Sequence, residues 1–200
     1  MNKNATIDHI IVPSLHNRWS PRAFSDRPIT PSTVRSLFEA ARWAPSCFNA
    51  QPWRFVMATR DDRASFERLV SCLMPGNQRW ASAAGLLAIT VANTQFASGK
   101  PNRHAWHDVG LAVAQLTVQA THEGLAVHQM AGIDPDRARD LLHIPEGYEP
   151  VTALAVGYPS DPDSLPEDLR ARELAPRTRF EQRELVFAGR WSEPASFPDE

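Results

Sequence analysis

Two arginines flank a serine near the beginning of the chain, in the stretch NRWSPRAF. Arg18, Ser20 and Arg22 alternate there with Trp19 and Pro21. Guanidinium groups form bidentate, charge-assisted hydrogen bonds with phosphate oxygens, and a serine hydroxyl adds one more donor. The pattern therefore suits a bound anion, but it also suits an ordinary solvent-exposed turn.

A second basic pair, Arg177 and Arg179, lies far downstream in the stretch APRTRF. The sequence contains no GxGxxG turn, no P-loop and no GxSxG nucleophile elbow. No glycine-rich loop therefore offers backbone N–H groups to a phosphate, and side chains would have to hold it. A phosphate dianion could use the downstream pair together with Arg18 and Arg22.

Histidines and cysteines give weaker indications of chemistry. His104 and His107 share one face of a predicted helix next to Asp108, but a catalytic zinc needs three protein ligands and no third is evident nearby. We therefore predict no metal site. Cys47 has no visible histidine partner, so we interpret it as a packing or pocket-lining residue. Together with Cys72 it forms no disulfide framework.

Length and composition exclude several classes of protein. The chain has 200 residues, of which 42% are hydrophobic and 22% charged, and its net charge is -2. These values predict a single globular domain with a substantial core. A nearly balanced charge argues against nucleic-acid binding and against electrostatic attachment to a membrane. The main apolar run, 81–92, is too short to span a bilayer, and no signal peptide is evident, so we expect a cytoplasmic location.

The hydrophobic pattern predicts the elements that position these residues. Helices are expected from the N-cap Thr30 to Pro45, after the cap Asp61, over 104–122, and from Asp134 to Leu142. Strands are expected over 54–59, 86–91, 125–130 and 151–156. The turn 75–77 should end the second helix, and the Pro- and acid-rich segment 158–176 should be extended. Helices with a few dispersed strands predict an α+β layered fold.

The helix predicted over 104–122 is apolar on two sides. Trp106 and Leu116 lie on one side, while Leu111 and Val118 lie nearly opposite. A helix that is apolar on two sides is buried on two sides. We therefore expect this helix to lie both in the core and at a subunit interface.

One longer stretch changes the balance between the two interpretations of the arginines. AARWAPSCFNAQPWRFVM, Ala40–Met57, contains a Pro-Ser-x-x-Asn-x-Gln-Pro-Trp pattern between a predicted helix and a predicted strand. An Arg-x-Ser-x-Arg-x-Phe stretch, Arg18–Phe24, lies upstream of this pattern. The two stretches, in this order along the chain, resemble the FMN-dependent nitroreductase family. Asn77, the stretch HDVGLAVAQLTVQATHEGLAV and the last strand, ALAVGYP, are also similar. The resemblance covers nearly the whole chain.

The resemblance implies a fold and an assembly. Members of the family have a three-layer α-β-α fold, in which helices flank a four- to five-stranded mixed sheet. They are intertwined homodimers with two FMN sites at the subunit interface. We therefore expect a single FMN-binding domain over 1–200, of which 158–200 is an extended C-terminal segment.

The resemblance also implies which residues hold the cofactor. The phosphate and ribityl chain of FMN should be surrounded by Arg18, Trp19, Ser20 and Arg22, and the phosphate should be closed off by Arg177 and Arg179. The pyrimidine edge should be bonded by Asn77, and the isoalloxazine ring should be flanked by Met130, Ala131 and Gly132. A loop that reaches in from the partner subunit should contribute Pro45, Ser46, Cys47 and Asn49.

One position departs from the family pattern. Three residues after the matching Asn77, many members carry a lysine near the flavin, whereas this chain has Trp80. A cation there would stabilise the anionic reduced flavin, so the reduction potential or the substrate class is expected to differ. The adjacent Arg79 should face elsewhere on its helix and should not replace the lysine.

The implied activity is ping-pong hydride transfer. NADH or NADPH would reduce FMN at N5, and a small acceptor such as a nitroaromatic, a quinone or an activated alkene would then be reduced. The flavin carries this chemistry, so no catalytic side chain is predicted. The alternatives are a specialised flavin reaction (dehalogenation, dehydrogenation or flavin fragmentation), a flavin-binding protein without turnover, and a dimeric interaction protein whose arginines bind nothing.

Overall fold

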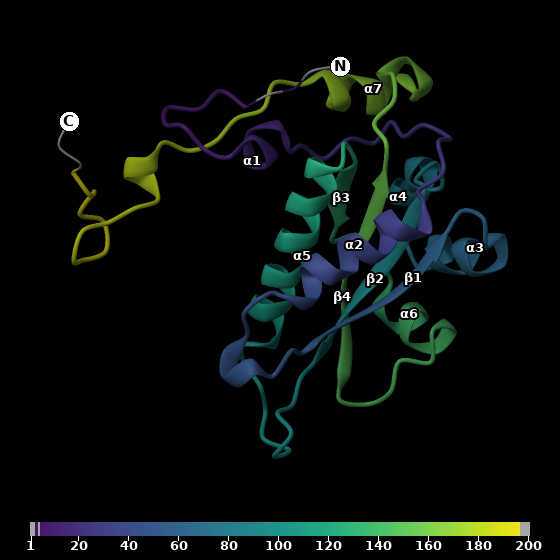
Figure 1. Ribbon diagram of the computed structural model, residues 1–200, viewed down its shortest axis with the longest axis horizontal. Coiled ribbons are helices and arrows are strands. Elements are labelled where there is room, and N and C mark those ends of the chain that lie inside the picture. Colours follow the sequence, from purple (N-terminus) through teal and green to yellow (C-terminus); the bar gives the residue numbers. More distant parts are fainter. Residues whose placement is uncertain (1–2, 4, 197–200) are drawn as a thin grey trace.

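A four-stranded sheet with helices on both faces forms the body of the protein (Figure 1). The computed structural model describes residue 3 and residues 5–196. The strands, in the sheet order β1-β2-β4-β3, are β1 (Trp53–Thr59), β2 (Leu86–Asn93), β3 (Ala126–Met130) and β4 (Tyr148–Gly157). All the predicted strands are therefore confirmed, with bounds shifted by a few residues.

Every pair of neighbouring strands in the described sheet is antiparallel, so the expected mixed sheet is wrong for this part of the chain. The register of the first pair shows why. Thr59 at the end of β1 faces Leu86 at the start of β2, so the intervening helices return the chain to the same end of the sheet. A parallel pair would need a crossover to the opposite end.

Two hydrophobic clusters, one on each face of the sheet, define three layers. On β2, Leu87 and Ile89 belong to one cluster, whereas Leu86 and Ala88 belong to the other. This alternation follows from the period-two geometry of a strand. The strands β1 and β4 cover both edges of β2 and the two clusters cover both its faces, so its residues 86–92 are all buried. The predicted α-β-α architecture is confirmed.

One face of the sheet carries α2 (Pro31–Arg42) and α5 (Ala105–His122), which pack on each other (Figure 1). On the outer side of α5, Leu111 and Val118 are only half-buried, and Trp106 near its beginning is 43% exposed. Within one chain, α5 is therefore buried on the side that faces the core and only partly covered on its outer side. Neither α5 nor any other helix of the described residues is long and apolar enough to cross a bilayer.

Three short helices cover the other face, namely α3 (Arg63–Ser71), α4 (Pro75–Ala81) and α6 (Pro135–Leu141). Two predictions need correction here. The N-cap of α3 is Asp62 rather than Asp61, because the Asp62 carboxylate accepts a hydrogen bond from the backbone of Ser65. Pro75 begins α4 instead of a turn, since proline suits the first turn of a helix.

The C-terminal segment departs most from the prediction. The stretch 158–176, expected to be extended, contains the 3₁₀ turn η2 (Pro162–Ser164) and the helix α7 (Glu167–Leu174). Acidic residues in the first turn of α7 stabilise the helix through its dipole. After α7 the chain has little regular structure: it contains the turn η3 (Gln182–Glu184) and a tight reversal in which Phe187 pairs with Pro194. It runs beside the N-terminal segment, which includes the unpredicted α1 (Pro13–Asn17), away from the sheet (Figure 1).

Candidate functional site

The predicted anion-binding residues line one cavity, at the end of the molecule where the N-terminal and C-terminal segments meet. Arg18, Ser20 and Arg22 come from the N-terminal segment, and Arg177 and Arg179 follow α7. The cavity has a volume of about 230 Å³, and its lining also includes Lys3, Trp19, Arg172 and Glu173. We call it the arginine cavity. The fold thus brings together two basic pairs that lie at opposite ends of the sequence.

Positive charge dominates the arginine cavity. Its lining contains one acid, Glu173, and six cations, Lys3, Arg18, Arg22, Arg172, Arg177 and Arg179. Burial, and then the charges of Arg177 and Arg179, lower the pKa of Arg18. Burial and Arg179 likewise lower the pKa of Arg177. The cations therefore repel one another, and a bound phosphate would relieve that repulsion.

Residues 18–24, which we call the clamp segment, are anchored to the sheet through their backbone. His128 on β3 donates a hydrogen bond from Nδ1 to the Pro21 carbonyl at 2.9 Å. The N–H group of Ser160, beyond the end of β4, donates to the Ala23 carbonyl at 3.0 Å. These contacts fix the backbone that carries the first basic pair.

Glu173 was not predicted to be a site residue, yet it lies directly behind the clamp segment. Its two carboxylate oxygens accept hydrogen bonds from the backbone N–H of Arg22 at 2.8 and 3.0 Å, and one of them accepts from Ala23 at 3.1 Å. The Glu173 side chain is fully buried. The spacing of Leu169 and Glu173, both buried on α7, is a helical signal that could have revealed an inner face. The signal was lost because this segment was expected to be extended.

Asn77 lies against the segment 130–132 at the end of β3. Its side-chain Nδ2 donates a hydrogen bond to the Gly132 carbonyl at 3.0 Å. A Cβ atom on residue 132 would lie 2.6 Å from this nitrogen, so any other residue there would force the Asn77 side chain to move. Met130 is buried in the core, and Ala131 is exposed. The residues that the resemblance assigns to the flavin ring are therefore neighbours in space.

Trp80, on α4, is a core residue. The residue is 3% exposed, and the centroid of its ring lies 6.4 Å from that of Phe24 and 4.4 Å from that of His128. Burial lowers the pKa of His128 to about 4, so this imidazole is neutral at pH 7 and packs on the indole without a charge. Arg79 faces away, as predicted, and its guanidinium donates two hydrogen bonds to the carboxylate of Asp168.

The loop 45–49 lies far from the arginine cavity within one chain. The N–H group of Cys47 donates to Asp108 Oδ2 at 3.0 Å, near the beginning of α5. Arg18 and Thr121 line a small cavity together near the other end of α5, which has 18 residues and therefore spans about 27 Å. The described chain thus does not bring the arginines together with the loop residues predicted for the cofactor, Pro45, Ser46, Cys47 and Asn49.

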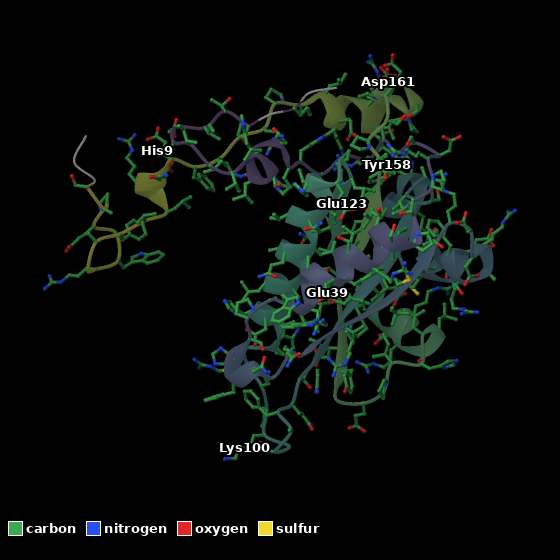
Figure 2. The ribbon with its side chains drawn as sticks, in the orientation of Figure 1. His9, Glu39, Lys100, Glu123, Tyr158 and Asp161 are labelled. Atoms are coloured by element: carbon green, nitrogen blue, oxygen red, sulfur yellow. The ribbon has the colours of Figure 1, made fainter. Side chains whose placement is uncertain are left out.

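The same loop has an unusual backbone. Phe48, Asn49 and Gln51 have φ angles of 51°, 54° and 46°, in the left-handed region that non-glycine residues rarely adopt. The Phe48 side chain is 92% exposed and borders a groove of about 700 Å³ that Lys100 also lines. Lys100 lies at the end of the molecule opposite Asp161 (Figure 2). Strained residues held by surrounding contacts cluster at functional sites.

Asp108 anchors this loop and gives the His104–Asp108 stretch a structural role. The Asp108 side chain is 3% exposed; one carboxylate oxygen accepts from the Cys47 N–H group, and the other lies 3.0 Å from His107 Nδ1. In the part of the chain that the structure describes, no group of three or more histidine, cysteine or acidic side chains is arranged to hold a metal ion.

A family model described as the nitroreductase family matches residues 15–158. This range includes the clamp segment, the loop 45–49 and all four strands. The chain belongs to the nitroreductase family. The resemblance inferred from the sequence motifs is therefore confirmed. The match ends before α7 and before the second basic pair of the chain, so the C-terminal side of the arginine cavity lies outside it.

Two relatives illustrate the similarity at the level of sequence. A protein of Mycolicibacterium smegmatis, described as an uncharacterized 15.4 kDa protein in the ask 5′ region, is 34% identical over 130 residues, covering 65% of this chain and 86% of the relative. A protein of Streptomyces coelicolor with the provisional name NADH dehydrogenase/NAD(P)H nitroreductase is 26% identical over 161 residues, covering 70% and 80%.

Solved structures share the fold. A crystal structure described as the oxidoreductase containing FMN superimposes with a TM-score of 0.89 and 35% identity, covering 96% of this chain and 98% of the other. A crystal structure of a protein from Parabacteroides distasonis has a TM-score of 0.70 and 21% identity, covering 89% and 96%. The second similarity shows the fold alone.

Proposed function

We propose that this nitroreductase-family protein binds FMN and transfers hydride from NADH or NADPH to a small electrophilic acceptor. One observation carries the proposal. Side chains from two distant segments, which were predicted from the sequence to share a phosphate, line one strongly cationic cavity. The similarity of almost the whole chain to a structure named as an FMN-containing oxidoreductase supports it.

The residues of the arginine cavity fit the phosphate end of FMN. Arg18, Arg22, Arg177 and Arg179 offer guanidinium donors, and the Ser20 hydroxyl adds another. Glu173 also lines the cavity, but both of its carboxylate oxygens already accept hydrogen bonds from the backbone. Neither oxygen is therefore left without a donor to face the phosphate. A cavity of about 230 Å³ holds only part of a molecule of this size, so the flavin ring would extend beyond it.

A chain of contacts leads from the arginine cavity to the residues proposed for the ring. The guanidinium of Arg22 lies over Trp80 on α4. Asn77 lies one turn earlier on the same helix and bonds Gly132. We propose that Asn77 and the backbone of 130–132 orient the flavin ring, with the Asn77 amide toward its pyrimidine edge.

When bound, FMN would supply the redox chemistry, taking hydride from the nicotinamide and passing it to a nitroaromatic, a quinone or an activated alkene. The chain's own residues bind the phosphate, orient the ring and limit the access of water. We assign no catalytic side chain, because none of these tasks requires a proton to move between protein groups.

We propose that a second copy of the chain completes each site. Loop 45–49 lies about one length of α5 from the arginines and presents Phe48 outward. In a two-fold dimer, the loop of one chain can lie beside the arginine cavity of the other. Contiguous exposed apolar surface marks interaction sites, and the C-terminal segment carries several exposed apolar side chains, Phe180, Leu185, Val186 and Trp191.

The proposal is tested with the purified protein. Bound flavin should appear in its absorption spectrum, and NADH or NADPH should bleach that spectrum without oxygen. Addition of a nitroaromatic or a quinone should then restore the colour. A protein that takes up no FMN on reconstitution would overturn the proposal. Flavin that neither nicotinamide reduces would indicate a binding protein without turnover, and bleached flavin that no such acceptor reoxidises would indicate a specialised reaction.

A further inference from the structure

We infer that Glu173 is a positioning residue for the phosphate site, which holds Arg22 and the clamp segment in the arrangement that meets the phosphate. The inference rests on the proposed binding of FMN. Glu173 lies on α7, 151 residues from Arg22 in the chain and beyond the residues that the family model matches. Among the described residues that line the arginine cavity, it is the one acid.

The Glu173 carboxylate holds the backbone from which the Arg22 side chain leaves. The N–H groups of Arg22 and Ala23 both point at it, with N···O distances of 2.8, 3.0 and 3.1 Å. An ionised carboxylate only accepts hydrogen bonds, so it suits two consecutive backbone donors. Hydrogen bonds to a charged acceptor are also stronger than those to a neutral one. The arrangement therefore restricts the direction in which the clamp segment runs.

The side chain of Arg22 is held as well. Its Nη1 lies 3.7 Å from Glu173 Oε2, and its guanidinium lies over the Trp80 ring, 5.9 Å from the centroid. Arg22 also lines the arginine cavity, and its side chain is 23% exposed. A guanidinium has five N–H donors, so the contact with Glu173 leaves donors for a phosphate.

Glu173 also connects the two halves of the arginine cavity. Lys3 Nζ donates to the backbone carbonyls of Glu173 and Ala175, the latter at 2.8 Å. Arg177 Nη1 in turn donates to the Lys3 carbonyl at 2.5 Å. The acid on α7 is therefore continuous with the segment that carries the second basic pair. The carboxylate of Glu173 thus holds the clamp segment, while its backbone carbonyl holds Lys3 beside the second basic pair.

Two other roles for Glu173 make different predictions. If Glu173 only balanced the charge of the arginines, its carboxylate would repel the phosphate, and its removal would strengthen FMN binding. Removal of a residue that only supports the fold would weaken the binding of FMN and of riboflavin, which lacks the phosphate, by the same factor. A positioning role weakens FMN binding selectively. The sign and the selectivity of the effect therefore separate the three.

The experiment compares Glu173→Gln with the wild type by titrating the apoprotein with FMN and with riboflavin. We expect the dissociation constant for FMN to rise roughly tenfold or more, and that for riboflavin to rise less than about threefold. The matched control is Asp168→Asn, which removes an exposed acid from the same helix, and both constants should stay within about twofold. Tighter FMN binding in Glu173→Gln, or equal losses for both ligands, would overturn the inference.

A second measurement needs no ligand and keeps the test decisive if Glu173→Gln folds poorly. Amide hydrogen exchange in the wild-type apoprotein should show protected N–H groups at Arg22 and Ala23. In Glu173→Asp, which keeps the charge on a shorter side chain, these two amides should exchange faster while those of β2 remain protected. Unprotected amides in the wild type would overturn the positioning role. A wild type that binds FMN no better than riboflavin would instead overturn the proposed phosphate site.

Discussion

The guanidinium of Arg22 lies over the ring of Trp80, with 5.9 Å between the guanidinium carbon and the ring centroid. Trp80 occupies the position at which the family resemblance leads one to expect a lysine, and it is 3% exposed. A lysine there would place a second cation next to Arg22 in the core. An indole instead offers its ring face to the arginine, which is a favourable cation–π contact.

The first prediction is that Trp80→Lys lowers the free energy of unfolding by roughly 3 kcal/mol or more, because it removes a large buried ring and buries a charge. Urea unfolding of the apoprotein measures the change. Trp80→Phe keeps an aromatic ring and should lose less stability. A Trp80→Lys variant as stable as the wild type, with a raised flavin midpoint potential, would instead put residue 80 at the flavin edge.

The second prediction is that Arg22→Ala weakens FMN binding by roughly 1.5–3 kcal/mol, the contribution of a charge-assisted hydrogen bond. Titration of the apoprotein with FMN measures the loss. Riboflavin should bind the variant about as well as it binds the wild type, because it lacks the phosphate. Arg79→Ala serves as the control, since Arg79 pairs with Asp168 outside the cavity. An FMN affinity that Arg22→Ala leaves unchanged would exclude Arg22 from the phosphate site.

The third prediction concerns pH and follows from His128. Burial lowers the pKa of the folded-state imidazole to about 4, whereas the unfolded value is about 6.5. The unfolded state therefore binds more protons between these values. The free energy of unfolding should fall as the pH drops from about 6.5 to about 4, by at most about 3 kcal/mol through this group, with no further loss from it below about 4.

The contribution of His128 is isolated by comparison with His128→Gln. Other titrating groups change the stability of both proteins, so the difference between the two unfolding curves reports on the imidazole alone. That difference should change across this pH window and be constant at higher pH. If the two stabilities instead run parallel throughout, the ring is not held in a buried, neutral state.

The fourth prediction tests the proposed two-chain site by complementation. Arg22→Ala damages the cavity side, and Ser46→Trp with Asn49→Ala damages the loop side. Each homodimer then has two damaged sites. A mixed dimer collects both lesions at one site and leaves the other intact, so after random reassortment about a quarter of all sites should recover.

The measurement uses two differently tagged variants that are co-expressed and isolated as mixed dimers. Bound FMN and anaerobic reduction by NADPH should both return in the mixed dimer but not in either homodimer. Inactive mixed dimers, despite verified mixing, would mean that the loop and the arginines serve the same chain, and the two-chain site would have to be abandoned.

Local signals in the sequence were sufficient to predict the helices and strands that residues close together in the chain determine. Thr30 followed by Pro31 predicted the start of α2, and the apolar run of β2 predicted a buried strand. The alternation of Arg18, Ser20 and Arg22 suited either a bound anion or an exposed turn, and the structure places all three residues in the lining of one cavity. The family followed from several such stretches in the correct order.

The tertiary structure decided what depends on contacts between distant segments. Nothing near Glu173 in the sequence reveals that the backbone of Arg22, 151 residues away, will satisfy its carboxylate. Nothing near Trp80 reveals that Phe24 and His128 will enclose its ring. The physical reason is that propensity and periodicity act between residues a few positions apart, whereas burial and hydrogen-bond partners arise only when separate elements pack together.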